Sequence, residues 1–269
     1  MGAYYRAVIS LTSREMKHWY RNRMQILITI VQPLVWLGLF GFAIQPFVVM
    51  RGFESYPEYF DFLSIGIVIA TALTTSMTGG MSIVWDRRFG FLEKLRAAPI
   101  PRGAVPLSRI LAATIKSVIQ AVIVLAVALL LGLELHGISI VSIGILLFSV
   151  VCIALIFSSV FVALGLVIKS FDTYMTLNTL LNMPLMFVSG VMFPTERFPD
   201  ILRIVADLNP LTYAADAVRR TSLDPAWMGN GTLSVPEIGL DGDLIIIAVV
   251  AVIAVTLGMA FARRALRQE

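Results

Sequence analysis

Cysteine and histidine are almost absent from this sequence. It has one cysteine, Cys152, and two histidines, His18 and His136, which lie far apart in the chain. One cysteine cannot form a disulfide within the chain, and these few side chains cannot assemble a thiolate metal site or a histidine-based nucleophilic triad. We therefore expect no catalytic residues and no bound metal, and the chain is not expected to be an enzyme.

Charge is also scarce, and no nucleotide-binding motif is present. Only 14% of the residues are charged, whereas 58% are hydrophobic and the mean hydropathy is +0.87. A soluble domain has too little interior to bury so much apolar surface. The net charge of +4 is spread between apolar runs, which argues against a nucleic-acid partner. The GxxxxGK[ST] phosphate loop is missing, so we expect this chain to bind no ATP by itself.

Long apolar runs dominate the chain instead. Six of them approach or exceed the ~20 residues that a helix needs to cross the hydrocarbon core. They cover residues 24–50, 62–85, 110–133, 135–168, 173–195 and 244–262. The sequence therefore predicts an all-α integral membrane protein with six transmembrane helices, organised as a single transmembrane domain over residues 1–269. Spans 1 to 5 fall within 24–192, and span 6 with a short tail occupies 244–269.

The charged residues orient these spans. An even number of crossings places both termini on one side of the membrane. If that side is cytoplasmic, the inner segments hold 16 of the 21 basic residues and the outer loops hold 12 of the 17 acidic ones. This distribution obeys the positive-inside rule. We expect a multi-pass protein of the plasma membrane of a prokaryote, with both termini cytoplasmic.

Residues 1–23 have apolar and basic residues at helical spacing, which predicts an interfacial helix. Its cations, among them Lys17 and Arg21, suit an anionic leaflet. The helix is either a surface anchor alone or also a contact for a cytoplasmic partner. The residues assigned to its apolar face are Tyr5, Val8, Ile9, Thr12, Met16, Trp19 and Tyr20.

The loop after the second span is the only sizeable cytoplasmic one. Residues 86–98 can form a short helix with Phe89, Leu92 and Arg96 near one face, and the prolines at 99 and 101 would end it. Such a short, charged helix could pass force from a soluble motor into the membrane. The alternative is an ordinary basic loop that obeys the positive-inside rule.

Residues 193–243 form the large external segment. Asn209 and Pro210 make an N-cap followed by proline at the first helical position, and Pro199 can open a preceding helix. We expect two re-entrant helices here, at about 199–208 and 210–221. This hairpin either caps a pathway from outside or lies in solvent.

Two spans carry polar stripes. In the second span the stripe consists of Thr71, Thr74, Thr75, Thr78 and Ser82. In the fifth it consists of Tyr174, Asn178, Asn182 and Ser189, with Met186 nearby. Polar side chains at these depths either line a translocation path or bond neighbouring helices together.

The segment 187–219, FVSGVMFPTERFPDILRIVADLNPLTYAADAVR, resembles the SG-x-x-FP … P … NPLTY-x-x-D-x-R signature of the type-2 ABC transporter permeases. The group includes the daunorubicin-resistance and nodulation-factor exporters. A second segment, RRFGFLEKLRAAPIPR, is similar to the coupling-helix region of that family at Glu93, Leu95 and Pro99. The signature positions are Ser189, Gly190, Phe193, Pro194, Pro199, Asn209, Pro210, Leu211, Thr212, Tyr213, Asp216 and Arg219.

The resemblance implies the permease subunit of an ATP-driven exporter. Two permease copies, identical or closely paralogous, would join two ATPase subunits that carry ATP and Mg²⁺, and the second and fifth spans would line the path. The interfacial helix and the 86–98 helix would contact the ATPases. The residues implied in this coupling are Lys17, Arg21, Arg88, Phe89, Leu92, Glu93 and Arg96.

The sequence constrains the identity of the substrate less than any other aspect of function. The fifth span is Met-rich and mostly aliphatic, and an adaptable surface of this kind favours a hydrophobic or amphipathic molecule, drug-like or lipid-like. Export of a polysaccharide or lipid-linked glycan on the same scaffold is the alternative. The alternative from another class is an intramembrane enzyme or carrier that acts alone.

Overall fold

The structure is a computed structural model that describes residues 2–43, 56–91, 94, 100–101, 103–135, 139–195, 198–223 and 238–268 of the chain. Within these ranges all regular secondary structure is helical. Five helices are long and apolar enough to cross a membrane, so the chain is an all-α integral membrane protein, as predicted. The five cover Arg23–Gly41, Tyr59–Arg88, Ala104–Leu130, Ile140–Val167 and Gly239–Ala265.

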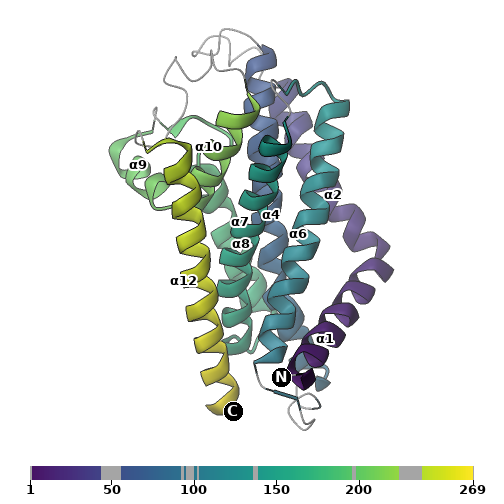
Figure 1. The fold of residues 1–269 in the computed structure, drawn as a ribbon. Helices are drawn as coiled ribbons and strands as arrows, with labels where there is room; N and C mark the ends of the chain where they lie inside the picture. The colour runs from purple at the N-terminus through teal and green to yellow at the C-terminus, as the bar shows by residue number, and fades with distance from the viewer. Residues whose placement is uncertain are drawn as a thin grey trace.

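Helix α4 (Tyr56–Arg88) forms the centre of the bundle, and its apolar span is almost entirely buried. Around it pack α6 (Ala104–Leu130), α7 (Ile140–Val167) and α8 (Phe171–Val188), and α12 (Gly239–Gln268) packs against α7 (Figure 1). The polar side chains in the middle of α4 are therefore presented mainly to neighbouring helices or to cavities. The residues of the path predicted from the sequence are therefore expected beside this helix.

Helices α4 and α7 approach closely at two facing glycines. A β-carbon on Gly80 would overlap the backbone carbonyl of Phe161, and one on Gly165 would overlap the backbone of Gly80. Small residues of this kind let membrane helices touch backbone to backbone. The Tyr174 hydroxyl of α8 lies beside the same glycine of α4. One turn of α4 thus positions both α7 and α8.

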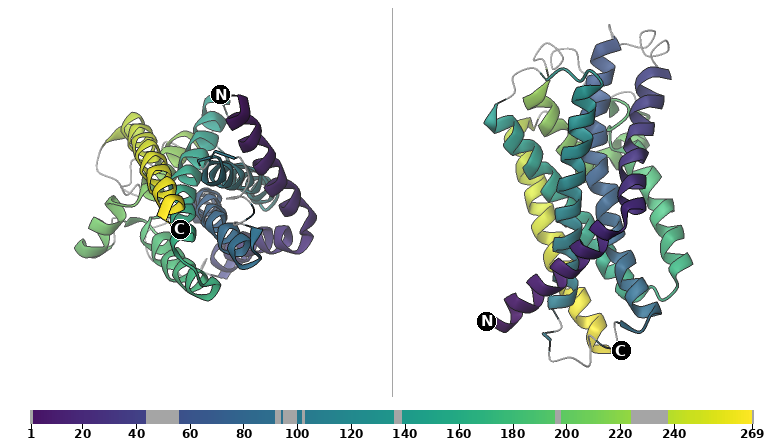
Figure 2. Two further views of the ribbon diagram at one scale, coloured as in Figure 1. Left: turned by 90° about the horizontal axis from the view of Figure 1, so that it is seen from below. Right: turned by 90° about the vertical axis from the view of Figure 1, so that its right-hand side faces the viewer.

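Helix α1 (Gly2–Arg21) lies obliquely across the end of the bundle that also holds both termini (Figure 2). Asn22 separates it from α2 (Arg23–Gly38), because the Asn22 side chain caps α2 by accepting a hydrogen bond from the backbone N–H of Gln25 at 3.2 Å. Helix α2 continues as a π-helical turn, Leu39–Ala43. Most of α2 is exposed, so it stands at the edge of the bundle.

The face of α1 that packs against the bundle differs from the predicted apolar face. Val8, Leu11, Glu15 and Trp19 are buried, whereas Tyr5, Ile9 and Tyr20 are exposed. Leu11 and Glu15 replace the outer aromatic residues because α1 packs on α6, where Arg109 pairs with Glu15. The exposed aromatic and aliphatic residues are available to the membrane interface.

Several spans extend beyond their predicted ends. The second was predicted at 62–85 and the third at 110–133, but α4 and α6 continue through Asp61, Asp86 and Arg109. Charge does not end these helices because its cost is offset by pairing. Asp86 pairs with Arg109, and Asp61 accepts a hydrogen bond from the backbone N–H of Glu134 at 3.0 Å.

The other span boundaries shift for local reasons. Helix α7 starts at Ile140 and not at 135, because the Ser139 hydroxyl caps it by accepting from the N–H of Ser142 at 3.1 Å. Helix α8 starts at Phe171 and ends at Val188, and Asn178 and Asn182 lower its apolar content enough to leave it outside the five apolar spans. Part of the first predicted span, 44–50, lies outside the described residues.

The helix predicted at 86–98 does not begin at residue 86. Helix α4 runs on to Arg88, and Gly90 then reverses the chain with a φ of 68°, a value that glycine adopts without steric penalty. The buried pair between Asp86 and Arg109 makes residues 86–88 the last turn of α4. Leu92, Glu93 and Arg96 lie outside the described residues.

Two short helices lie at the opposite end from the termini (Figure 1). Helix α9 spans Asp200–Asp207 and α10 spans Pro210–Ser222, close to the predicted 199–208 and 210–221. Helix α9 is mostly exposed, whereas residues 211–219 of α10 are all buried among α4, α7 and α12. The second helix is therefore part of the core and not a solvated arm.

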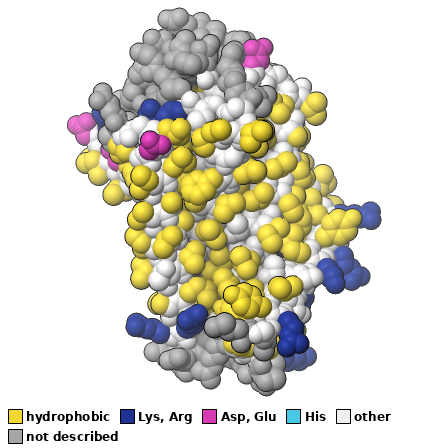
Figure 3. All heavy atoms as spheres, viewed as in Figure 1, with side chains coloured by type: hydrophobic (Ala, Val, Ile, Leu, Met, Phe, Trp, Pro, Cys, Tyr) yellow, Lys and Arg dark blue, Asp and Glu magenta, His cyan; other side chains and the backbone are white. Residues whose placement is uncertain are grey.

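Apolar and charged side chains occupy separate zones of the surface. Figure 3 shows apolar side chains covering the middle of one face, with most of its lysines and arginines at the terminal end or beside it. The acidic side chains visible there lie near the other end. This arrangement matches a bundle whose middle faces hydrocarbon and whose ends face water.

Candidate functional site

The two predicted polar stripes meet across α4 and α8. Asn182 Nδ2 donates to Thr74 Oγ1 at 3.3 Å, and Asn178 Nδ2 donates to the Met77 carbonyl at 3.4 Å. Tyr174, which is fully buried, donates its hydroxyl to the same carbonyl at 2.6 Å. The stripe on α8 therefore bonds directly to α4, and both interpretations of the stripes depend on whether space remains beside this contact.

The threonines also bond within α4. Thr71 donates to the Ile67 carbonyl at 2.8 Å, Thr74 to Ala70 at 3.1 Å and Thr78 to Thr75 at 2.6 Å. Serine and threonine in membrane helices commonly bond back to their own backbone in this way. Ser189 likewise donates to Met186, is fully buried, and lines neither cavity described below.

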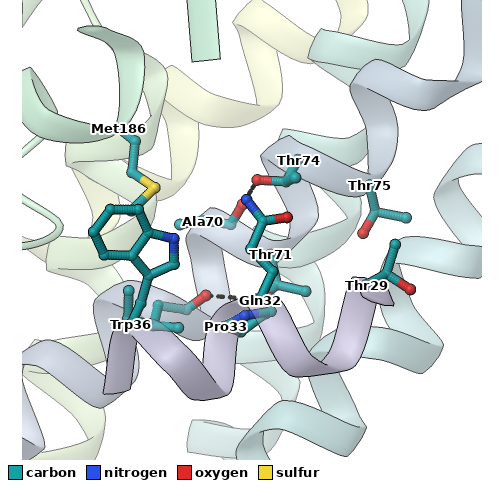
Figure 4. Close-up of a pocket in the computed structure, with 10 residues that line it drawn as sticks. Thr29, Gln32, Pro33, Trp36, Ala70, Thr71, Thr74, Thr75 and Met186 are labelled. Carbon is teal, nitrogen blue, oxygen red and sulfur yellow. Dashed lines mark hydrogen bonds between the residues drawn. The ribbon is translucent and has the colours of Figure 1, made fainter. Parts of the chain in front are cut away.

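A narrow cavity of about 20 Å³, room for about one water molecule, lies between α2, α4 and α8. In Figure 4, Trp36 and Met186 lie at one side and Thr29, Thr74 and Thr75 at the other. Thr71, Thr74, Thr75 and Met186 of the predicted path line it, whereas Tyr174, Asn178 and Asn182 do not. A cavity of this volume has no room for a molecule larger than water.

Gln120 of α6 completes the polar seam and was missed by sequence reasoning. It is fully buried, donates a hydrogen bond to Thr29 of α2, and accepts one from Thr75 of α4. Three helices are thus joined by one amide. The signal was a glutamine in the middle of a mostly aliphatic span, where a polar side chain needs partners.

A second, larger cavity of about 810 Å³ opens toward the terminal end of the bundle. Thr29 lines both cavities, so the large one reaches the level of the small one at this residue. Thr78 is the predicted path residue in its wall. The walls come from α1, α2, α4, the turn after α4, and α6: Arg14, Glu15, His18, Trp19, Asn22, Met24, Gln25, Ile28, Thr29, Thr78, Met81, Ser82, Trp85, Asp86, Phe89, Phe91, Lys94 and Lys116.

A buried ionic cluster forms one side of this cavity. Arg109 of α6 pairs with both Glu15 of α1 and Asp86 of α4, and only 2% of its side chain is exposed. Arg14 lies 3.5 Å from Asp86, and Lys116 lies 3.7 Å from Glu15. The cluster ties the oblique helix to the ends of two spans, so a displacement of α1 would be transmitted to α4 and α6. The sequence interpretation had counted Arg109 only as a loop charge.

The signature residues hold the α8–α9–α10 segment together. Asn209 accepts a hydrogen bond from the N–H of Leu211 and donates to the Leu185 carbonyl at 2.8 Å. Tyr213 donates to the Asp207 carbonyl at 2.6 Å. Burial, together with nearby carboxylates, raises the pKa of Tyr213, so it remains a donor. These bonds satisfy carbonyls at the ends of α8 and α9.

Arg219 links three parts of the chain. Its guanidinium donates to the Phe62 carbonyl of α4 at 3.0 Å and to the carbonyls of Gly190 and Val191 at 3.0 and 2.9 Å. It also lies 3.4 Å from the centroid of the Phe62 ring. Burial lowers the pKa of Arg219 to about 9, which leaves it charged at neutral pH. Gly190 and Pro194 of the signature form the buried turn that it holds.

Arg220, the next residue, points toward two buried acids. It donates to Asp216 at 2.9 Å, and its Nε lies 3.6 Å from Asp243 of α12. Burial raises the pKa of Asp216, and Arg220 opposes this shift. Two carboxylates thus share one directly paired cation at the junction of α10 and α12.

Because of this imbalance, Asp243→Asn is expected to stabilise the protein. The substitution replaces a buried carboxyl group, which lies near a second carboxylate, by a neutral amide, and it leaves the closer Asp216–Arg220 pair intact. We expect a thermal midpoint in detergent that rises by about 2–4 °C, which corresponds to ~1 kcal/mol for a domain of this size. The exposed Asp241→Asn, on the same helix, serves as the control and should shift the midpoint little. A lower midpoint for Asp243→Asn would show that its charge is needed.

The described residues implied in coupling, Lys17, Arg21, Arg88 and Phe89, lie toward the terminal end. Arg88 and Phe89 are exposed at the end of α4, and the Phe89 ring stacks on Trp85 with centroids 5.4 Å apart. Lys17 and Arg21 are exposed on α1. They line a hollow of about 830 Å³ with Ser10, Ser13, Arg14, His18 and Asn22.

Fold and site together define a multi-pass membrane protein with a polar seam and a cavity that opens toward the end of the bundle where both termini lie. The family model for ABC-2 type transporters matches residues 6–223. The chain belongs to the ABC-2 type transporter family, a family of transport permeases, as the signature predicted.

Named relatives agree with this assignment. The chain is similar to the transport permease ycf38 of Porphyra purpurea, at 30% identity over 85% of this chain and 77% of the relative. It is similar to the daunorubicin resistance ABC transporter permease protein DrrB1 of Streptomyces coeruleorubidus, at 23% identity over 84% and 76%. It is also similar to nodulation protein J of Azorhizobium caulinodans, at 26% identity over 81% and 83%.

Proposed function

We propose that this chain is the permease subunit of an ATP-driven exporter that moves a hydrophobic or amphipathic molecule, drug-like or lipid-like, out of the cytoplasm or the inner leaflet. The observation that carries this proposal is the 810 Å³ cavity, which opens at the terminal end and reaches Thr29, a residue that also lines the narrow cavity at the α4 seam. Its mixed aromatic, aliphatic and charged wall suits such a molecule. The drug-resistance permease among the relatives supports the same substrate class.

Six crossings fit this arrangement best. Helix α8 runs within the bundle beside α4, although it is less apolar than the five other spans. Both termini lie at one end of the molecule in Figures 1 and 2, which an even number of crossings requires. The gathering of basic side chains at that end supports its placement in the cytoplasm, with α9 and α10 re-entrant on the outside. The membrane is then the plasma membrane of a prokaryote.

The ATPase subunits would bind at the terminal end. The hollow lined by Lys17 and Arg21 and the exposed end of α4 at Arg88 and Phe89 offer a basic surface there. Leu92, Glu93 and Arg96, which lie outside the described residues, would complete the contact. Motion of a bound subunit would reach the path through the Arg109 cluster. ATP and Mg²⁺ would be held by the two partner subunits.

A second permease copy would close the path. Helices α2 and α8 both contribute to the narrow cavity, and both expose apolar side chains on their outer faces, among them Val31, Val35, Leu180 and Met183. A facing copy, identical or paralogous, would cover these residues and complete the wall of the path.

Purification of the chain from its source membrane tests this proposal. We expect a nucleotide-binding subunit to copurify in a 1:1 ratio, and Glu93→Arg to dissociate it or uncouple transport. Glu134→Arg, an exposed glutamate at the opposite end, is the control and should retain the subunit. Isolation of the chain alone, with activity in liposomes that lack any ATPase, would instead favour an enzyme or carrier that acts by itself.

The role of the α8 stripe is tested by Asn182→Leu. The change removes a hydrogen bond to Thr74 beside the narrow cavity. We expect substrate-stimulated ATP hydrolysis of the complex to change about threefold, which matches the ~0.6 kcal/mol of an average hydrogen bond between membrane helices. Thr179→Leu, an exposed position on the same helix, is the control. Unchanged turnover and substrate range in Asn182→Leu would mean that α8 does not line the path.

A further inference from the structure

We propose that the 810 Å³ cavity is a loading site for an amphiphile with an acidic headgroup, and that Lys116 and Arg14 contact the acid. The inference rests on the proposed function, because it makes this cavity the entry to the same path, and it narrows the substrate class to acidic amphiphiles.

The charges on the cavity wall do not balance. Arg14, Lys94 and Lys116 line it, and Arg109 lies behind it, against only two acids, Glu15 and Asp86. Counted formally, four cations face two anions, a net charge of +2 among the described residues. Arg109 balances the charge of only one of the two acids, so Arg14 and Lys116 together carry one positive charge in excess, and Lys94 adds a second.

Arg14 and Lys116 both have donors to spare. The Lys116 ammonium is mostly buried and lies 3.7 Å from Glu15, too far for a hydrogen bond. Arg14 Nη1 is buried, and within the described part of the chain it has no hydrogen-bond partner. Buried cationic donors without partners are unfavourable, and an acidic group placed between them would satisfy both.

About half of the other wall residues are apolar, and polar ones such as Asn22, Gln25 and Ser82 lie among them. Trp19, Trp85 and Phe91 lie near the charges, and Ile28 and Met81 continue the wall toward Thr29. The cavity is within the ~300–1,000 Å³ range of sites that bind small molecules. A free inorganic anion would leave these aromatic and aliphatic surfaces uncovered, whereas an amphiphile satisfies the cations with its headgroup and covers the apolar wall with its chain.

Lys116 lies about two turns deeper along α6 than Arg109. It stands one turn before Gln120, which bonds Thr29 and Thr75 at the narrow cavity. A headgroup at Lys116 would therefore lie at the inner end of the large cavity, directly below the closed seam. This position suits a substrate that waits for the path to open.

The test is a binding titration with the full chain in nanodiscs of zwitterionic lipid. Lysophosphatidic acid and lysophosphatidylcholine, both with the same brominated acyl chain, are added, and quenching of Trp19 and Trp85 is recorded in a Trp36→Phe, Trp227→Phe background. We expect lysophosphatidic acid to bind about tenfold more tightly than lysophosphatidylcholine. One additional charge-assisted hydrogen bond, worth ~1.4 kcal/mol, accounts for a difference of this size. Lys116→Met should remove this preference, and Lys116→Arg should retain most of it.

Two controls keep the outcome interpretable. Lys169→Met, an exposed lysine outside the cavity wall, should leave the preference unchanged. Inorganic phosphate at constant ionic strength should not displace the acidic lipid. The inference would be overturned if inorganic phosphate displaced the acidic lipid as effectively as lipid does. Equal quenching by both lipids, with Lys116 unchanged, would also overturn it. In Lys116→Met, Glu15 keeps its pair with Arg109, so the variant is expected to fold, which gel filtration checks.

The titration needs neither ATP nor a partner subunit. Equal binding of both lipids, with a copurifying ATPase, would refute the loading site and leave the proposed function standing. A clear preference for the acidic lipid in a chain that purifies without any ATPase would refute the proposed function alone.

Discussion

Replacing Arg219 with leucine is expected to remove most of the folded protein. The guanidinium is fully buried and holds three carbonyls, those of Phe62, Gly190 and Val191. Leucine would leave these groups without their donor and break the link between α10, α4 and the turn after α8. We expect a loss of about 3–5 kcal/mol, because uncompensated polar groups in a buried site are strongly destabilising. Monodispersity after detergent extraction and the thermal midpoint measure it.

Arg203→Leu is the matched control for this prediction. Arg203 lies on α9 at the same end of the molecule and is exposed, so its loss should leave both measurements nearly unchanged. Arg219→Lys should fall between the two, since an ammonium keeps the charge but cannot reproduce the planar fork of donors. A fully folded, monodisperse Arg219→Leu protein would show that the signature arginine does not hold α10 in the core.

Gly80→Ala is expected to have a similarly large effect. The added methyl group would overlap the backbone carbonyl of Phe161 and approach the Tyr174 hydroxyl, so no flexible side chain of α7 can move aside to make room. The helices α4 and α7 must then move apart, which is expected to lower the free energy of unfolding by about 3 kcal/mol or more. The expected result is a poorly extracted, aggregated protein with a low thermal midpoint.

Gly144→Ala gives the comparison. A β-carbon at Gly144, which lies on α7, meets no atom within 4 Å among the described residues, and alanine also favours helix over glycine. This variant should be as stable as the unsubstituted chain or slightly more so. Equal stability of the Gly80 and Gly144 variants would mean that the two helices are not in close contact at Gly80.

Local patterns in the sequence predicted the helices well. Apolar runs are a property of neighbouring residues, so the spans around α4, α6, α7 and α12 were found, and the Asn209-Pro210 step located the start of α10. The ends were displaced because Asp86 and Arg109 are buried by pairing with each other over a separation of 23 residues. Such a pair is invisible to a local pattern, in which a charge simply marks the end of an apolar run.

The candidate site was predictable only in part. The threonine and asparagine stripes were identified because helical spacing places each set on one face, and they do meet across α4 and α8. Glu15 and Gln120 were not found, because their significance depends on which helices pack together. Glu15 lies in a basic helix and Gln120 in an aliphatic one, and only the tertiary structure brings them to Arg109 and Thr75.

The proposal that an outside ATPase drives this permease from the terminal end is tested most directly by site-specific photo-crosslinking in source membranes. A photoreactive amino acid replaces exposed Arg88 in one variant and exposed Arg203, at the opposite end, in the other. We expect position 88 to form an adduct with a nucleotide-binding subunit, identified by mass spectrometry, and position 203 to form none. An adduct at 203, or none at 88 in a chain that transports without ATP, would contradict it.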